Sequence, residues 1–227
     1  MLKLKSVILL IIISTVVFIG CSKDEDPVVP TQSISKVMVV HSSPDAPAVD
    51  LLVDNQVAGT NLSFPSNTSY LEVNSGTRNF KVNVAGTNTT VIDVSPSLTM
   101  NTSYSVFAVN SVASIEPLLL TDDLSTPASG KAHVRFIHLS PDAPAVDITL
   151  TDGTIVFGNR AFKEFTPFTP LDAGTYNLQV RVAGTSTVAL DLPGITLQAG
   201  KIYTVFAKGF LAGSGAQVLG AQIIANN

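Results

Sequence analysis

Apolar and polar residues alternate with a period of two along several short segments of the chain, most clearly across 80–84 and 176–182. Successive side chains of a β-strand point to opposite faces of a sheet, so this pattern predicts half-buried strands. More continuous apolar runs, at 37–40, 106–109 and 203–207, predict strands that are buried more completely. Because no window shows a convincing apolar period of 3.6 residues, the pattern favours an all-β chain.

Turn-forming residues separate these segments, and the chain has 15 Gly and 13 Pro. The predicted strands of the first half are 36–41, 49–53, 68–73, 78–84, 89–94, 103–109 and 114–120. Those of the second half are 132–139, 146–150, 154–157, 165–169, 176–182, 187–192, 201–207 and 216–224.

The chain contains an internal repeat. His41 to Asp50 reads HSSPDAPAVD and His138 to Asp147 reads HLSPDAPAVD, which are identical at nine of ten positions with an offset of 97 residues. A Val-Ala-Gly-Thr sequence recurs at an offset of 98, from Val84 to Val182, and a Tyr-x-Val-Phe-Ala sequence at an offset of 99, from Tyr104 to Tyr203. The growing offset predicts two equivalent frameworks with single-residue insertions in surface loops.

These patterns predict two tandem immunoglobulin-like β-sandwich domains. We expect a first sandwich at 35–121, a polar linker at 122–130 in which Asp122 and Asp123 are solvated, and a second sandwich at 131–227. Each repeat is expected to be stable through its own hydrophobic core. Tyr104 and Tyr203, which occupy matched strands, are expected to be core residues.

Charge and cysteine content narrow the classes of partner. All seventeen acidic residues follow Cys21, whereas Lys3 and Lys5 precede it, so the part after Cys21 has eleven basic residues and a net charge of −6. Without a basic stripe to neutralise phosphates, nucleic acid is not an expected partner. Cys21 is the only cysteine, which excludes an internal disulfide and cysteine-rich metal frameworks, and no cofactor is predicted.

The first residues have the pattern of an export signal. Lys3 and Lys5 precede a 13-residue run, Val7 to Ile19, that is apolar except for Ser14 and Thr15. The run ends in Phe-Ile-Gly before Cys21, which resembles a bacterial lipobox, although Phe18 stands where Leu is usual. We predict a lipoprotein signal peptide at 1–20, lipid attachment at Cys21 and a flexible tether at 21–34. The membrane, through this anchor, is then a partner.

A lysine followed by acidic residues, at 23–26, resembles the export signal of some outer-membrane lipoproteins. This predicts a cell-envelope protein of the outer membrane that is exposed at the cell surface, with the periplasmic face as the alternative.

The most specific motif is the duplicated H-x-S-P-D-A-P-A-V-D. Its candidate ligand-binding or structural residues are His41, Asp45 and Asp50, and their twins His138, Asp142 and Asp147. In one interpretation the prolines form a rigid corner in which Asp50 reaches back to hydrogen-bond His41. In the other, an imidazole and two carboxylates in each repeat bind a ligand or a metal ion. A metal site is not predicted, because Asp54, a possible further ligand, has Thr151 at the matching position.

No catalytic residues are predicted. The chain has no G-x-S-x-G, H-E-x-x-H or glycine-rich phosphate loop. A triad of Ser42 or Ser43 with His41 and Asp50 is disfavoured, because adjacent strand residues point to opposite faces of the sheet.

The motif, its duplication and the lipoprotein context resemble the bacterial domain of unknown function 4397, over about Ser35 to Ile224. The resemblance implies an extracytoplasmic β-sandwich module and brings no reaction with it. We therefore expect a lipid-anchored envelope protein, not an enzyme, that is an interaction or structural module for an envelope protein or an extracellular ligand. The alternative is a ligand- or metal-binding receptor with one site per repeat at the SPDAPAVD corner.

Overall fold

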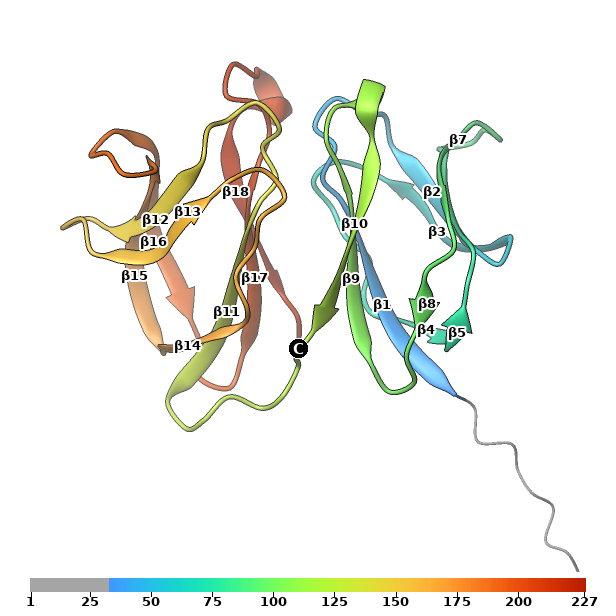
Figure 1. Cartoon of the computed structure of the whole chain (residues 1–227), viewed down its shortest axis with the longest axis horizontal. Coiled ribbons are helices and arrows are strands. Elements are labelled where there is room, and N and C mark those ends of the chain that lie inside the picture. The colour runs from blue at the N-terminus through green and yellow to red at the C-terminus, as the bar shows by residue number, and fades with distance from the viewer. Residues whose placement is uncertain (1–32) are drawn as a thin grey trace, which may run out of the picture. The chain divides into compact units, whose positions relative to one another are not determined.

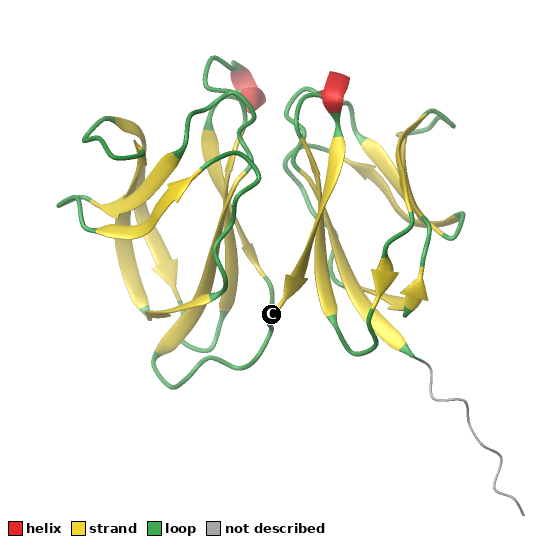
Figure 2. Ribbon diagram, in the orientation of Figure 1, coloured by secondary structure: helices red, strands yellow, loops and turns green. Residues whose placement is uncertain are grey.

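The computed structural model describes residues 33–227. The predicted signal peptide, Cys21 and all but the last residues of the predicted tether lie outside this range. The described chain is built from strands and two short 3-10 turns, η1 (Val112–Ser114) and η2 (Gly215–Gln217), as Figure 2 shows. These residues form no helix of the length and apolarity that crossing a bilayer requires.

Repeat 1 is a sandwich of two four-stranded sheets (Figure 1). One sheet has the order β10-β9-β1-β4 and the other the order β3-β2-β6-β7, with a small β5-β8 ribbon beside them. Its strands are β1 (Ile34–His41), β2 (Val49–Val53), β3 (Gln56–Leu62), β4 (Leu71–Asn74), β5 (Gly76–Thr77), β6 (Phe80–Val84), β7 (Thr90–Val94), β8 (Ser97–Leu98), β9 (Ser103–Val109) and β10 (Glu116–Asp122).

Repeat 2 has the same topology, with the sheets β14-β11-β17-β18 and β13-β12-β15-β16. Its strands are β11 (Lys131–His138), β12 (Val146–Leu150), β13 (Ile155–Arg160), β14 (Thr169–Asp172), β15 (Gly174–Val182), β16 (Val188–Leu197), β17 (Ile202–Lys208) and β18 (Gly220–Ala225). The predicted fold class, two β-sandwiches in tandem, is confirmed.

The first strand of each repeat lies parallel to a strand from near the end of that repeat. β1 pairs with β9 from Lys36↔Ser103 to His41↔Ala108, and β11 pairs with β17 in the equivalent register up to His138↔Ala207. The remaining strand pairs are antiparallel. This pairing explains why the Tyr-x-Val-Phe-Ala sequence recurs: it forms β9 and β17, the strands that pair with the motif-bearing strands β1 and β11.

The two insertions lie in different kinds of structure. In repeat 1, β2 and β3 are joined by a two-residue turn, Asp54–Asn55, with both residues at positive φ, whereas the corresponding turn of repeat 2, at 151–154, is longer. The second insertion lies within β16, where the register of the β15–β16 pair shifts beside Gly194. The prediction of a loop is therefore wrong for the second insertion, because a β-bulge admits an extra residue inside a strand.

Alternating apolar residues fill the space between the two sheets of each repeat. Val37, Val39 and Val82 belong to the core of repeat 1, and Val134 and Phe136 belong to that of repeat 2. The two matched tyrosines are buried as predicted, and their hydroxyl groups accept hydrogen bonds from the N–H groups of Thr99 and Gln198.

A third core joins the two repeats. Its buried members come from the outer face of the β10-β9-β1-β4 sheet and from the matching sheet of repeat 2: Met38, Val40, Phe107, Val109, Leu120, Ile137, Leu139, Phe206 and Ile224. The expectation that each repeat relies on its own core alone is wrong. The alternating residues of β1 and β9 that point away from the first core are apolar too, and they pack against the other repeat.

Candidate functional site

The duplicated motif forms a corner between the two sheets of each repeat. His41 ends β1 and Asp50 lies in β2, so residues 42–48 carry the chain from one sheet to the other. His138 and Asp147 occupy the same places on β11 and β12. Pro44 and Pro47 restrict the backbone of the crossing and remove two N–H donors from it.

The motif histidines are buried and hydrogen-bond the backbone of their own corner. Nε2 of His41 lies 3.0 Å from the carbonyl oxygen of Pro47, and Nε2 of His138 lies 2.9 Å from that of Pro144. A carbonyl oxygen only accepts, so Nε2 carries the proton and donates. The predicted hydrogen bond between Asp50 and His41 is therefore wrong, because the nearer backbone carbonyl takes the imidazole N–H.

Burial lowers the pKa of both histidines below the ordinary value of 6.5, because it disfavours the charged imidazolium. Their exposed fractions are 1% and 0%. The hydrogen bonds to the proline carbonyls act in the opposite direction but are the smaller effect. Both rings are thus held as neutral donors at neutral pH.

The last aspartate of each motif joins two surface segments. Asp50 accepts hydrogen bonds from the backbone N–H of Asn61 at 2.8 Å and of Gly86 at 2.9 Å. Asp147 accepts them from Asn159 at 2.6 Å and from Gly184 at 2.9 Å. The same pair of N–H donors lowers the pKa of Asp50.

These contacts explain the second repeated sequence. Gly86 and Gly184 are the glycines of the two Val-Ala-Gly-Thr segments, and they have φ values of 71° and 72°. A residue without Cβ adopts this left-handed conformation at little cost, and the turn then directs its N–H at the motif carboxylate. The motif and the Val-Ala-Gly-Thr sequence of each repeat are therefore the two sides of one contact.

The first aspartate of each motif binds the loop that follows β9 in repeat 1 or β17 in repeat 2. Asp45 accepts a hydrogen bond of 2.7 Å from the N–H of Val112, and Asp142 accepts one of 2.7 Å from Leu211. These loops contain η1 and η2 and lead into β10 and β18. Both carboxylates of each corner thus organise loops that are distant in sequence.

The two corners differ in their buried hydroxyl groups. In repeat 2, the Ser140 hydroxyl donates to the carbonyl of Gly209 at 2.6 Å, and the Ser140 N–H donates to Nδ1 of His138 at 3.3 Å. In repeat 1, Nδ1 of His41 and the hydroxyl groups of Ser42 and Ser43 are buried without a hydrogen-bond partner in the described structure.

The three candidate side chains of each repeat are directed at different partners. The histidine binds its own corner, and the two aspartates bind three separate segments through backbone N–H groups. Asp54 lies in the β2–β3 turn, where it accepts hydrogen bonds from the N–H of Asn79 and from Arg78. Within residues 33–227, no three His, Cys, Asp or Glu side chains lie together in a way that could hold a metal ion.

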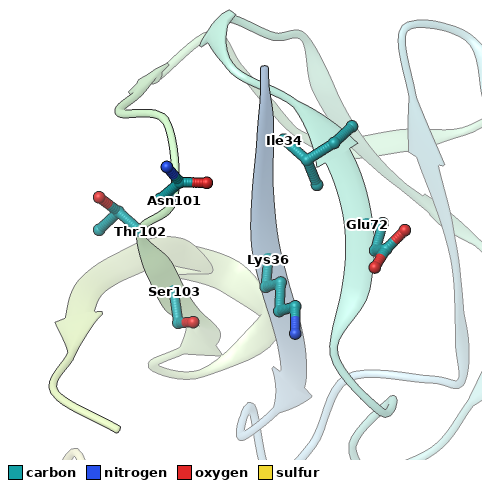
Figure 3. A pocket seen from close by; sticks show the side chains of 6 residues that line it. All are labelled: Ile34, Lys36, Glu72, Asn101, Thr102 and Ser103. Atoms are coloured by element: carbon teal, nitrogen blue, oxygen red, sulfur yellow. The ribbon is translucent and has the colours of Figure 1, made fainter. Parts of the chain in front are cut away.

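A surface hollow of about 360 Å³ lies away from the motif (Figure 3). Its lining residues come from β1, β4, and the turn into β9 and the start of that strand: Ile34, Lys36, Glu72, Asn101, Thr102 and Ser103. The hollow is at the beginning of β1, whereas His41 is the last residue of that strand. It contains none of the predicted site residues.

A buried polar network between the repeats was not expected from the sequence. The carboxylate of Asp122 lies 2.7 Å from Nη1 of Arg135, and the two side chains are 0% and 2% exposed. Asp122 also accepts hydrogen bonds from Tyr70 at 2.5 Å and from Ser105 at 2.6 Å. The expectation that Asp122 is a solvated linker residue is wrong, since it ends β10 and is buried.

Repeat 2 completes this network. Arg135 donates to the hydroxyl of Thr204, which donates to Asn226, and the amide of Asn226 donates to Tyr70 of repeat 1 at 3.0 Å. The guanidinium lies 4.5 Å from the ring centroid of Phe168. A signal was present in the sequence: Arg135 stands between the apolar residues Val134 and Phe136, at the position where the first repeat has Met38.

Comparison with known proteins gives one family. The model of a domain of unknown function, DUF4397, matches two adjacent segments, 35–149 and 149–227. The segments meet at the end of β12, whereas the strand pairing divides the chain between β10 and β11. No curated protein matches the chain. The matched segments cover almost all described residues and both motif corners, and the chain therefore belongs to the DUF4397 family.

Proposed function

We propose that the protein is a lipid-anchored module of the bacterial cell envelope whose two sandwiches have a non-catalytic, interaction or structural role. The observation that carries this proposal is the use of the motif carboxylates. In both repeats, the carboxylates accept hydrogen bonds from the backbone N–H groups of a neighbouring strand and of two loops that are distant in sequence. A motif used in this way sets the shape of one end of the sandwich and presents its loops.

The anchor rests on the sequence alone. A basic start, a 13-residue apolar run and a single cysteine at its end are what diacylglyceryl transfer to Cys21 requires. Several acyl chains hold a protein firmly, at about 0.8 kcal/mol for each buried methylene. The expected location is the outer membrane, exposed at the cell surface.

The anchor is tested by Cys21→Ala, with Ser22→Ala as a matched neighbour. The Ser22→Ala protein should stay in the membrane fraction and incorporate labelled fatty acid. The Cys21→Ala protein should lose the label and leave the outer-membrane fraction. Equal labelling of the two variants would contradict lipid attachment at Cys21. Protease accessibility in intact cells then distinguishes the cell surface from the periplasmic face.

The non-catalytic role is tested on the part of the chain after Cys21. We expect no turnover in a screen of hydrolase and transferase substrates, and co-purification of an envelope component with the tagged protein from cross-linked cells. Turnover that disappears in the His41→Ala, His138→Ala double variant would overturn the proposal. Two-site binding of a divalent ion, lost in Asp50→Asn with Asp147→Asn, would favour a receptor instead.

A further inference from the structure

The contact between the two repeats has the form of a dimer interface. Phe107 and Phe206 occupy equivalent positions in β9 and β17, and their rings meet edge to face with centroids 5.9 Å apart. Contact between equivalent residues is the mark of an isologous interface, in which the same surface is used on both sides. The two repeats thus pack as two similar subunits would.

The equivalent positions around this pair differ in charge. Met38 of repeat 1 pairs with Ser105, and Arg135 of repeat 2 pairs with Thr204 in the same register, so Met38 and Arg135 are equivalent. Asp122 lies opposite Ser103. The N–H of Asn226 donates to Ile202, which occupies the place of Ser103 in repeat 2.

Asp122 and Asn226 are therefore equivalent as well. Their side chains also make matching contacts within each repeat, one with the Ser105 hydroxyl and the other with the Thr204 hydroxyl. Repeat 1 thus contributes one carboxylate to the interface, and repeat 2 contributes one guanidinium.

We propose that the Asp122–Arg135 pair makes this interface selective, so that repeat 1 pairs with repeat 2 and each repeat rejects a second copy of itself. Two copies of repeat 1 would bury two Asp122 carboxylates, each facing a methionine in the place of Arg135. Two copies of repeat 2 would bury two guanidinium groups, each facing Asn226. Only the unlike pair brings one cation to one anion.

The cost of the like pairs follows from burial. A buried charge that loses its partner is strongly unfavourable, whereas the paired charges compensate for much of their desolvation. Each like pair would contain two unpartnered charges, so we expect unlike pairs to be favoured by at least 100-fold. The apolar residues of the third core would stabilise every pairing, and the two charges would determine which pairing is preferred.

The test uses the folded chain after Cys21, with a protease site inserted between Ser125 and Thr126, which are both exposed. The protein is cut after folding, and unlabelled and ¹⁵N-labelled samples are mixed and allowed to exchange. Native mass spectrometry then counts the pairs. We expect unlike pairs with exchanged labels and less than about 1% of like pairs. Like pairs in comparable amounts, or separate halves without pairs, would overturn the proposal.

Two variants test the role of the charges. Asp122→Asn together with Arg135→Met gives both repeats the neutral set, and like pairs of both kinds should then appear beside unlike pairs. Asp122→Asn alone relieves only repeat 1, so it should give pairs of repeat 1 without pairs of repeat 2. Folded variants that still form unlike pairs only would show that another feature selects the partner. The cleaved protein without substitutions tests the selectivity even where a variant does not fold.

Discussion

The substitution Asp147→Ala tests directly whether the motif stabilises the fold by holding neighbouring segments together at the corner of repeat 2. Asp147 is 6% exposed and accepts hydrogen bonds of 2.6 Å and 2.9 Å from two backbone N–H groups. One donor is Asn159, which has a positive φ of 49°, and the other is Gly184 of the Val-Ala-Gly-Thr turn. Truncation removes both hydrogen bonds at once and leaves two donors without their acceptor.

A hydrogen bond to a charged group contributes about 1.5–3 kcal/mol, so the two bonds set an upper limit of about 6 kcal/mol. Both donors lie near the surface, where water can replace the carboxylate in part. We therefore expect the free energy of unfolding to fall by about 2–4 kcal/mol. For a unit of this size, that corresponds to a fall in Tm of roughly 5–15 °C.

The assay is thermal and urea unfolding of the chain after Cys21, with two comparison variants. Asp147→Asn keeps one acceptor oxygen and should lie between the wild type and Asp147→Ala. Asp172→Ala removes a carboxylate that is 77% exposed and paired with Lys131, and should change stability by less than about 1 kcal/mol. If Asp147→Ala unfolds at the same temperature as Asp172→Ala, the carboxylate is not a structural clamp and the reasoning fails.

Three further perturbations address the histidines, the shared core and the loop after β17. Because burial lowers the pKa of His41 and His138 below 6.5, the unfolded chain takes up protons that the folded chain does not. The contribution of the two neutral histidines to the free energy of unfolding should be fully present above about pH 6.5. Below that pH it should decrease by up to about 1.4 kcal/mol per pH unit for each histidine, as measured by urea unfolding from about pH 7.5 to 5. Phe206→Ala should cost about 3–5 kcal/mol in the same assay, because this fully buried ring packs between the repeats. Gly209→Ala should cost more than about 1 kcal/mol in a thermal melt, because φ is +83° and a Cβ would overlap the backbone of the following loop.

Matched variants accompany these three measurements. His41→Gln with His138→Gln should flatten the pH dependence between about pH 5 and 6.5, and an unchanged slope would assign it to other groups. Ile223→Ala, at a side chain that is 39% exposed, should cost far less than Phe206→Ala. Gly200→Ala has a similar φ of +78° with no atom near the added Cβ, so a cost equal to that of Gly209→Ala would exclude the overlap as the cause.

Periodicity and repetition allowed the sandwiches to be predicted, because both can be read directly from the order of the residues. The strand β3 was missed for the same reason. Its sequence, QVAGTNL, has one glycine, three polar residues and no buried residue, so it lacks an apolar alternation. It becomes a strand through pairing with β2, where the positive-φ turn at Asp54 and Asn55 reverses the chain. The equivalent segment of repeat 2, with Ile155 and Phe157, carried a visible pattern.

The partners of the motif residues could not be deduced from spacing along the chain. Asp50 and Asp45 accept hydrogen bonds from residues 36 and 67 positions away. The β2–β6 pairing brings the first donor to the corner, and the β1–β9 pairing brings the second. The interface was hidden because Met38 and Val40 read as ordinary core residues. Asp122 was hidden because it adjoins polar residues that do form a connection.

The parallel pairing of β1 with β9 has a consequence for the order of events during synthesis. β1, at the start of repeat 1, cannot pair with β9 until residues 103–109 have been made. The apolar face of repeat 1 that packs against repeat 2 stays uncovered until β17 and β18 have been made. Contacts that span so much of the chain form slowly. The sheets of repeat 1 therefore cannot close until about half of the chain has been made, and its apolar outer face stays uncovered until nearly all of the chain has been made.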